Sequence, residues 1–354
     1  MPDTLAKSGQ IIAARVEEFM SRRRFLKTSA LFGAGAITGG LGLSAARAQS
    51  GATDGPTPIR MGGYGPATTS FSQALKQIGD RLAARFGEEV DVRYVYSVTD
   101  VGYGPRDLAW LVDSGVLTLG YLQMSAGIPE LELAALPFLF QDTTAARAAM
   151  DGPLGQAAIE RIESQTNYRV LGYFENGFRH VSNNVRPVRA PADMRSLKIR
   201  VLPVQARAFE LLGADPQTMG IPDAVAALQA GTLDGQENPF ANAVNYGLYA
   251  TQQYFTATYH SYLSRPIFVH RTSYEAWPEA LQTELQAAVR DAVAWQRDQH
   301  DQEEEESAAI IRAAGGEIIE LTADEHAAFV EAVAPIYAET RATYDPELLS
   351  LIDL

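Results

Sequence analysis

The sequence contains no cysteine, and this absence removes several kinds of chemistry. Neither a disulfide, nor a thiolate metal site, nor a cysteine nucleophile can form. A Gly-x-Ser-x-Gly nucleophile elbow is also missing. Five histidines occur, and none of them has a neighbour at His-x-x-x-His or another ligand spacing (His180, His260, His270, His300 and His326). The sequence therefore predicts no metal and no cofactor, and it disfavours an enzyme.

Basic residues are also scarce. The chain carries 29 Lys and Arg against 43 Asp and Glu, a formal net charge of −14. Without the first 48 residues the balance becomes 22 basic against 40 acidic residues, a net charge of −18, and only Lys76 and Lys198 remain as lysines. So acidic a chain is a poor partner for nucleic acid or anionic membranes. If it binds an anion, it needs a local group of arginines to oppose its own field.

Long apolar runs are absent, and the N-terminus instead has the pattern of an export signal. Ser21–Lys27 (Ser-Arg-Arg-Arg-Phe-Leu-Lys) matches the twin-arginine motif. A glycine-rich, mildly apolar stretch follows, and an Ala-x-Ala site ends at Ala48, so cleavage is expected before Gln49. A membrane anchor is the alternative, but the stretch is short and broken by glycines. We predict a signal peptide at 1–48 that uses the Tat export machinery, a linker at 49–58, and a periplasmic location.

The most informative stretch lies in the middle of the chain. Leu197–Val201 alternates apolar and cationic side chains, which predicts a strand that ends before Pro203. Arg200 then lies near the carboxyl end of a strand, where open α/β sheets place their ligands. The segment 234–239, Asp-Gly-Gln-Glu-Asn-Pro, is predicted to be a polar turn close by. Together they suggest an anion pocket.

The remaining chain predicts an α/β fold. Segment 59–121 shows a β-α-β-α-β pattern, typical of a mostly parallel sheet covered by helices. Arg179 follows a predicted strand at 170–174, which we interpret as a neighbour of the Arg200 strand. A long helix at 278–314 would span roughly 54 Å, enough to lie across two lobes. Glu303–Glu306 is interpreted as its solvated face. Further helices are predicted at 71–86, 108–112, 145–163, 222–231 and 323–344, and further strands at 90–98, 262–270 and 317–321.

Several motifs, in order, resemble the solute-binding subunits of tripartite ATP-independent periplasmic (TRAP) transporters, the DctP family. The resemblance covers residue 59 to the C-terminus. Its motifs are Leu-Pro-Phe-Leu-Phe at 136–140, Asn-Gly-Phe-Arg-His at 176–180, Arg-Ser-Leu-Lys-Ile-Arg-Val at 195–201, Leu-Gly-Ala-Asp-Pro at 212–216, Ala-Leu-Gln-Ala-Gly-Thr-Leu-Asp-Gly-Gln-Glu-Asn-Pro at 227–239 and Thr-Tyr-His at 258–260.

The resemblance implies a two-lobed periplasmic binding protein with a hinge and a long helix that spans both lobes. Lobe I would comprise 59–176 plus 264–303, and lobe II 177–263 plus 304–354. Such a protein closes on a carboxylate ligand and delivers it to TRAP membrane permease subunits, without catalysis. A ligand sensor, or a periplasmic enzyme acting on a carboxylate, is the alternative.

The resemblance also implies roles for individual residues. Arg200 would clamp the ligand carboxylate with its two parallel donors, a fork that lysine lacks. Arg179 would be a second, supporting arginine, and Asn238 a ligand-contacting amide. Ile221 falls near a position that often holds an aromatic. The predicted site is completed by three aromatic residues, Phe240, Tyr64 and Tyr121.

Overall fold

The computed structural model describes residues 55–352 and Leu354. The predicted twin-arginine signal peptide and most of the predicted linker lie outside the described residues. Strand β1 begins at Thr57 and pairs with its neighbour from that residue on, so Thr57 and Pro58 belong to a strand. None of the described helices combines the length and the apolar composition needed to cross a membrane.

The first of two sheets has five strands in the order β2-β1-β3-β10-β4. The pairs β1–β2 and β1–β3 are parallel, as predicted, and β10 is antiparallel to both β3 and β4. These strands are β1 (Thr57–Gly62), β2 (Val90–Val95), β3 (Leu119–Tyr121), β4 (Tyr168–Phe178) and β10 (Tyr262–His270). The helices of this part are α2 (Ser70–Phe86), α3 (Asp107–Asp113), α4 (Pro129–Ala134), α5 (Thr143–Asp151), α6 (Pro153–Gln165) and α10 (Arg271–Glu275).

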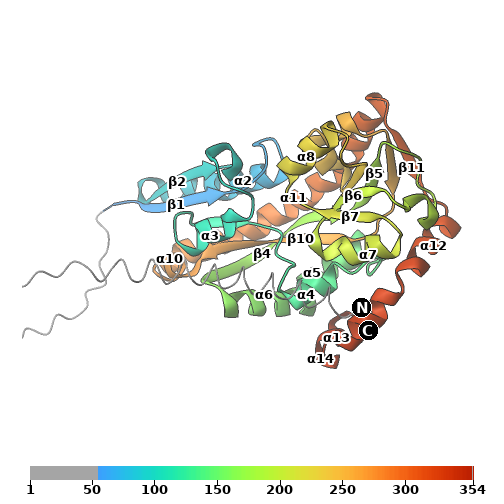
Figure 1. The fold of residues 1–354 in the computed structure, drawn as a ribbon. Coiled ribbons are helices and arrows are strands. Elements are labelled where there is room, and N and C mark those ends of the chain that lie inside the picture. The colour runs from blue at the N-terminus through green and yellow to red at the C-terminus, as the bar shows by residue number, and fades with distance from the viewer. Residues whose placement is uncertain (1–54, 353) are drawn as a thin grey trace, which may run out of the picture. The chain divides into compact units, whose positions relative to one another are not determined.

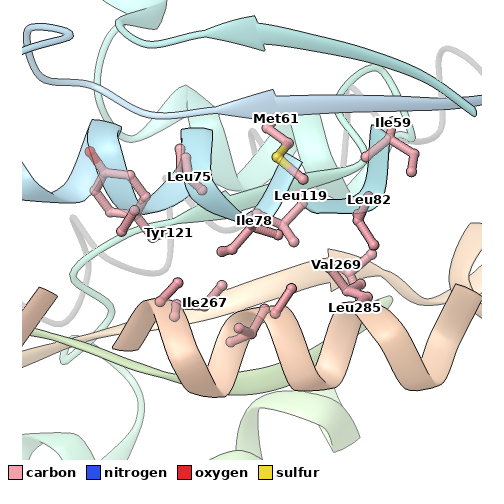
Figure 2. Packing of buried hydrophobic residues seen from close by; sticks show 14 of the residues in the cluster. Ile59, Met61, Leu75, Ile78, Leu82, Leu119, Tyr121, Ile267, Val269 and Leu285 are labelled. Carbon is pink, nitrogen blue, oxygen red and sulfur yellow. The ribbon is translucent and has the colours of Figure 1, made fainter. Parts of the chain in front are cut away.

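Helix α2 confirms the helix that apolar spacing predicts at 71–86. Leu75, Ile78 and Leu82 recur at helical spacing, and all three are buried. Figure 2 shows them between the strands of the sheet and the long helix that carries Leu285. By contrast, the single helix predicted at 145–163 is two helices, because Pro153 has no N–H to continue the first and starts the second instead.

The second sheet has six strands in the order β11-β9-β5-β8-β6-β7. They are β5 (His180–Asn183), β6 (Lys198–Val201), β7 (Asp215–Thr218), β8 (Gly235–Asn238), β9 (Tyr254–Ala257) and β11 (Glu317–Glu320). The associated helices are α7 (Ala206–Leu211), α8 (Ile221–Gln229), α9 (Phe240–Asn245), α12 (Ala323–Val333), α13 (Pro335–Thr343) and α14 (Pro346–Leu349). The helix predicted at 323–344 is interrupted, since Pro335 again starts a new one.

Helix α11 (Glu279–Ala313) connects the two sheets. Its 35 residues span roughly 50 Å, and it contacts α2 and β4 in one lobe and α9 and β11 in the other (Figure 1). The two sheets and this helix confirm the predicted two-lobed α/β class with one long bracing helix.

The prediction that Glu303–Glu306 is a solvated face is wrong for its first two residues. The Glu303 carboxylate accepts hydrogen bonds from Ser70 N (2.9 Å) and Ser70 Oγ (2.8 Å), at the start of α2. The Glu304 carboxylate accepts from Phe240 N (3.0 Å) and Ala241 N (2.9 Å), at the start of α9. Two adjacent carboxylates of α11 therefore cap one helix in each lobe, where free N–H groups favour negative charge.

The chain first passes from one sheet to the other between β4 and β5. Gly177, the second-last residue of β4, has φ of +79°, a left-handed conformation that favours glycine. A Cβ at this position would lie 2.0 Å from Nε2 of His300 on α11. The return passage joins β9 to β10, and Arg179 N donates across to Ser261 O (2.9 Å). Arg179 thus lies where the two connecting segments meet.

Candidate functional site

The segment predicted as a polar turn at 234–239 is instead largely strand β8, whose four residues are all buried. Strand β8 lies between β6, which carries Arg200, and β5, which begins directly after Arg179. The prediction that the two arginines lie on neighbouring strands is therefore wrong. Polar residues are tolerated in this central strand because they bond to their neighbours: Gln236 Nε2 donates to Ser182 Oγ (2.8 Å). At Gly235 a Cβ would lie 2.1 Å from Ser182 O, so the tight strand packing requires glycine.

Arg200 on β6 is only 4% exposed, although its side chain is charged. Within the described residues, the only hydrogen bond of its guanidinium runs from Nε to Met219 O (3.0 Å), and it forms no ion pair. Burial lowers its pKa to about 10, and the charge of Glu237 opposes that shift. Arg200 is therefore a nearly buried cation that presents two free donor groups, the geometry that a carboxylate matches.

Arg179 is equally buried but has a carboxylate partner, Glu237. Its Nε pairs with Glu237 Oε2, and its Nη2 donates to Glu237 Oε1 (2.9 Å), to Glu237 O (2.7 Å) and to Asn238 Oδ1 (3.0 Å). The charge of Arg179 is thus neutralised by the protein itself, and the side chain orients the amide of Asn238.

Glu237 holds several groups together besides Arg179. It accepts from Leu202 N (3.1 Å), just after β6, and its Oε2 lies 3.4 Å from Nε2 of His260. Burial acts to raise the pKa of Glu237, but the charge and hydrogen bonds of Arg179, together with the nearby His260, outweigh burial and lower it to about 2. The carboxylate is consequently ionised at every physiological pH.

Asn238 belongs to a chain of amides that joins the two lobes. Its Oδ1 accepts from Asn242 Nδ2 (3.3 Å), and the same Nδ2 donates to Asn176 Oδ1 (3.2 Å) on β4. Asn176 Oδ1 in turn accepts from Arg265 Nη2 on β10. The predicted residue Asn238 is therefore connected through Asn242 to Asn176 and Arg265 on the other sheet.

Tyr64 and Tyr121, the aromatic residues predicted from the first lobe, lie together. Their ring centroids are 5.5 Å apart, and Tyr121 also stacks on Phe71 (5.3 Å). Tyr121 is buried in the core of its lobe (Figure 2), whereas Tyr64 is half-buried. Burial raises the pKa of Tyr64 to about 12, so its hydroxyl remains protonated. The Arg265 guanidinium carbon lies 5.1 Å from the centre of the Tyr64 ring.

The two other predicted contacts occupy different environments. Ile221 is the half-buried first residue of α8, two residues after the Met219 carbonyl that binds Arg200. Phe240 is 6% exposed, and its ring stacks on His180 with centroids 4.3 Å apart. Phe240 therefore packs within the core of its lobe, and Ile221 follows the segment whose Met219 carbonyl accepts from Arg200.

Arg265, Asn176 and Asn242 were missed by the sequence reasoning. Arg265 offered a signal, because it is a charged residue in the otherwise apolar strand at 262–270. Asn242 offered one as well, since it follows Asn238 at one helical turn. In the part of the chain that the structure describes, no three His, Cys, Asp or Glu side chains form a group that could hold a metal ion.

Two α/β lobes braced by one helix, with buried arginines and amides where the connecting strands meet, define a two-lobed ligand-binding protein. Residues 64–343 match the family model for bacterial extracellular solute-binding protein, family 7 (DctP). The chain belongs to this family, whose members include the solute-binding proteins of TRAP transporters.

Individual relatives agree with this assignment. A solute-binding protein of Verminephrobacter eiseniae is 33% identical over 64% of this chain and 67% of its own. The C4-dicarboxylate-binding periplasmic protein DctP of Rhodobacter capsulatus is 28% identical over 76% of this chain and 84% of its own. The crystal structure of a TRAP periplasmic solute-binding protein from Bordetella bronchispeptica, with density interpreted as pantoate, superimposes with a TM-score of 0.77 at 29% identity, over 84% of this chain and 99% of that one.

Proposed function

We propose that this protein captures an organic acid in the periplasm and delivers it to the membrane permease subunits of a TRAP transporter. It reaches the periplasm through the Tat machinery and catalyses no reaction. Lobe I comprises 59–176 plus 264–303 and lobe II 177–263 plus 304–354. The family membership supports the transport role, and the descriptions of the similar proteins, one C4-dicarboxylate-binding and one with pantoate, support an acid as ligand.

The observation that carries the proposal is the state of Arg200. A nearly buried guanidinium without a carboxylate partner is unfavourable, because burial strips its hydration and, within the described residues, only the Met219 carbonyl replaces part of the lost interaction. A ligand carboxylate that accepts from both free Nη groups would restore a paired, bidentate geometry. Arg179 cannot take this role equally well, since Glu237 already neutralises it.

The other predicted residues complete the site around that clamp. Asn238 donates or accepts beside the carboxylate, and Arg179 supports it through the hydrogen bond to its Oδ1. Tyr64 and Tyr121 border the ligand from lobe I. Ile221 contacts the apolar part of the ligand next to Arg200. Phe240 supports the site indirectly, because its ring stacks on His180 and its backbone begins α9.

The test is ligand binding by variants of Arg200. A carboxylate library is first screened by thermal shift on the mature protein, where a ligand at 100 times its Kd adds about 2.7 kcal/mol of stability. Arg200→Lys and Arg200→Met should then lose at least tenfold in affinity by calorimetry, because lysine lacks the planar fork and methionine lacks the charge. Arg195→Lys, on an exposed residue just before the same strand, is the matched control.

Near-normal affinity in Arg200→Lys would refute the clamp. Closure is tested separately by small-angle scattering, where saturating ligand should reduce the radius of gyration of the wild type. An unchanged radius would refute closure while leaving the clamp intact.

A further inference from the structure

Arg265 is a second nearly buried cation in this molecule. It lies on β10, is 5% exposed, and its guanidinium carbon sits 4.2 Å from the centre of the Phe71 ring and 5.1 Å from that of Tyr64. Its Nη2 donates to Asn176 Oδ1, while its buried Nε has no hydrogen-bond partner in the described residues. The aromatic faces offset part of the cost of burying the charge, but they do not neutralise it.

No carboxylate of the described residues pairs with Arg265. The nearest acidic residue along the neighbouring strand is Glu175, which lies opposite Ser264. This carboxylate pairs with Arg147 instead, because Arg147 Nε donates to Glu175 Oε2 (2.6 Å). Removing a charge from water costs several kcal/mol unless a counter-charge replaces the hydration. Arg265 therefore has the same deficit as Arg200.

A line of polar side chains leads from Arg265 to the strand beside Arg200. It runs through Asn176 and Asn242 to Asn238. Asn238 Nδ2 donates to Gln236 Oε1, and Gln236 pairs with Arg200 in the register of β8 and β6. Polar side chains therefore connect the surroundings of the two guanidinium groups across both sheets.

The charge count of the site points to the ligand class. Arg179 is neutralised by Glu237, whereas Arg200 and Arg265 are both uncompensated by the described residues. A monoacid would neutralise one of them and leave the other buried and unpaired. Hydroxyl groups would fill hydrogen bonds at Arg265 but would leave its charge.

Building on the proposed clamp at Arg200, we propose that Arg265 binds a second anionic group of the ligand. The site then selects dianions over monoacids of the same size. The shared chemistry is an anionic oxygen group at each end, with a carboxylate at Arg200 and a carboxylate or sulfonate at Arg265.

Matched acids test this selectivity. Calorimetry on the mature protein compares succinate with butyrate and galactarate with galactonate, and 3-sulfopropionate tells a sulfonate from a carboxylate. The wild type should prefer the diacid in at least one pair. Arg265→Gln should reduce the diacid-to-monoacid affinity ratio about 30-fold, the equivalent of about 2 kcal/mol for truncating one partner of a buried charge pair. Arg265→Lys should keep part of the preference, because it keeps the charge.

Two controls separate the alternatives. Arg85→Gln, on an exposed arginine at the end of α2, removes the same charge at a distance and should leave the ratio unchanged. Circular dichroism confirms that Arg265→Gln is folded.

If that variant weakens the binding of diacid and monoacid equally, Arg265 only positions Asn176 and the inference is overturned. A wild type that binds monoacids as tightly as diacids overturns it too, yet leaves the proposed function standing. Failure of every acid to bind removes the proposed function itself.

Discussion

Replacing Glu237 by glutamine should reveal how strongly the Arg179–Glu237 pair holds the centre of the second sheet. The two side chains are 2% and 0% exposed, so neither charge can recover its hydration when the other is removed. Glu237→Gln would leave Arg179 without a counter-charge, and the amide could keep only some of the bonds to Arg179, Leu202 N and His260. Breaking a buried pair in this way costs about 3–5 kcal/mol.

The assay is urea unfolding of the mature protein, followed by circular dichroism and tryptophan fluorescence. With a slope near 3 kcal/mol per molar urea, a loss of about 3 kcal/mol moves the midpoint by about 1 M. Glu339→Gln is the matched control, because Glu339 pairs with Arg207 on the surface, where both side chains are 48% exposed. Exposed pairs contribute about 0–1 kcal/mol.

The pH dependence gives an independent check of the same pair. Because the folded-state pKa of Glu237 is lowered to about 2, its contribution to stability is complete above its ordinary value and is lost as pH falls toward 2. The difference between wild type and Glu237→Gln should therefore shrink between pH 4.5 and 2. A variant that loses less than about 1 kcal/mol at pH 7 would refute this account of the pair.

Two further predictions concern the connection between the lobes. Burial raises the pKa of Glu304 to about 7, so the folded state binds its proton more tightly than the unfolded state, and the resulting stability is lost as pH rises from about 4.5 through 7. Relative to Glu304→Gln, the wild type should lose about 1–3 kcal/mol over that range in urea unfolding, and parallel curves would contradict the prediction. Gly177→Ala should lower stability by about 2–4 kcal/mol, from left-handed strain plus the clash with His300. Gly231→Ala, also at positive φ but with nothing within 4 Å, should lose only the strain, and equal losses in both would refute the clash.

Much of the fold follows from periodicity, because burial of one face imposes it. The apolar spacing of Leu75, Ile78 and Leu82 predicted α2, and the strand predicted at 262–270 is β10 with the same bounds. Interruptions were harder to place. Pro153 and Pro335 each restart a helix within a stretch whose apolar spacing continues, so periodicity alone joined the pieces.

The candidate site could be predicted only in part. Arg200 was placed at the end of its strand, as β6 has it. Strand β8 was predicted as a turn, because Gln-Glu-Asn is unfavourable in a buried strand unless partners from distant segments satisfy it. Those partners, Ser182 for Gln236 and Arg179 for Glu237, are 54 and 58 residues away in the sequence and leave no local trace. Likewise, only the three-dimensional arrangement shows that Glu237 neutralises Arg179 and leaves Arg200 free of a carboxylate partner among the described residues.

The structure distinguishes residues that join the two sheets from the two buried arginines that we propose to bind the ligand. Arg179 joins the two connecting segments by its backbone, since its N donates to Ser261 O and its O accepts from His260 N, while its side chain is fixed on Glu237. Helix α11 holds both lobes as well, through Glu303 and Glu304. Changes at these positions alter the population of the binding-competent arrangement and so scale every ligand's apparent affinity by one factor. Changes at the two uncompensated arginines instead alter affinity ligand by ligand, and comparing matched acids distinguishes the two groups of residues.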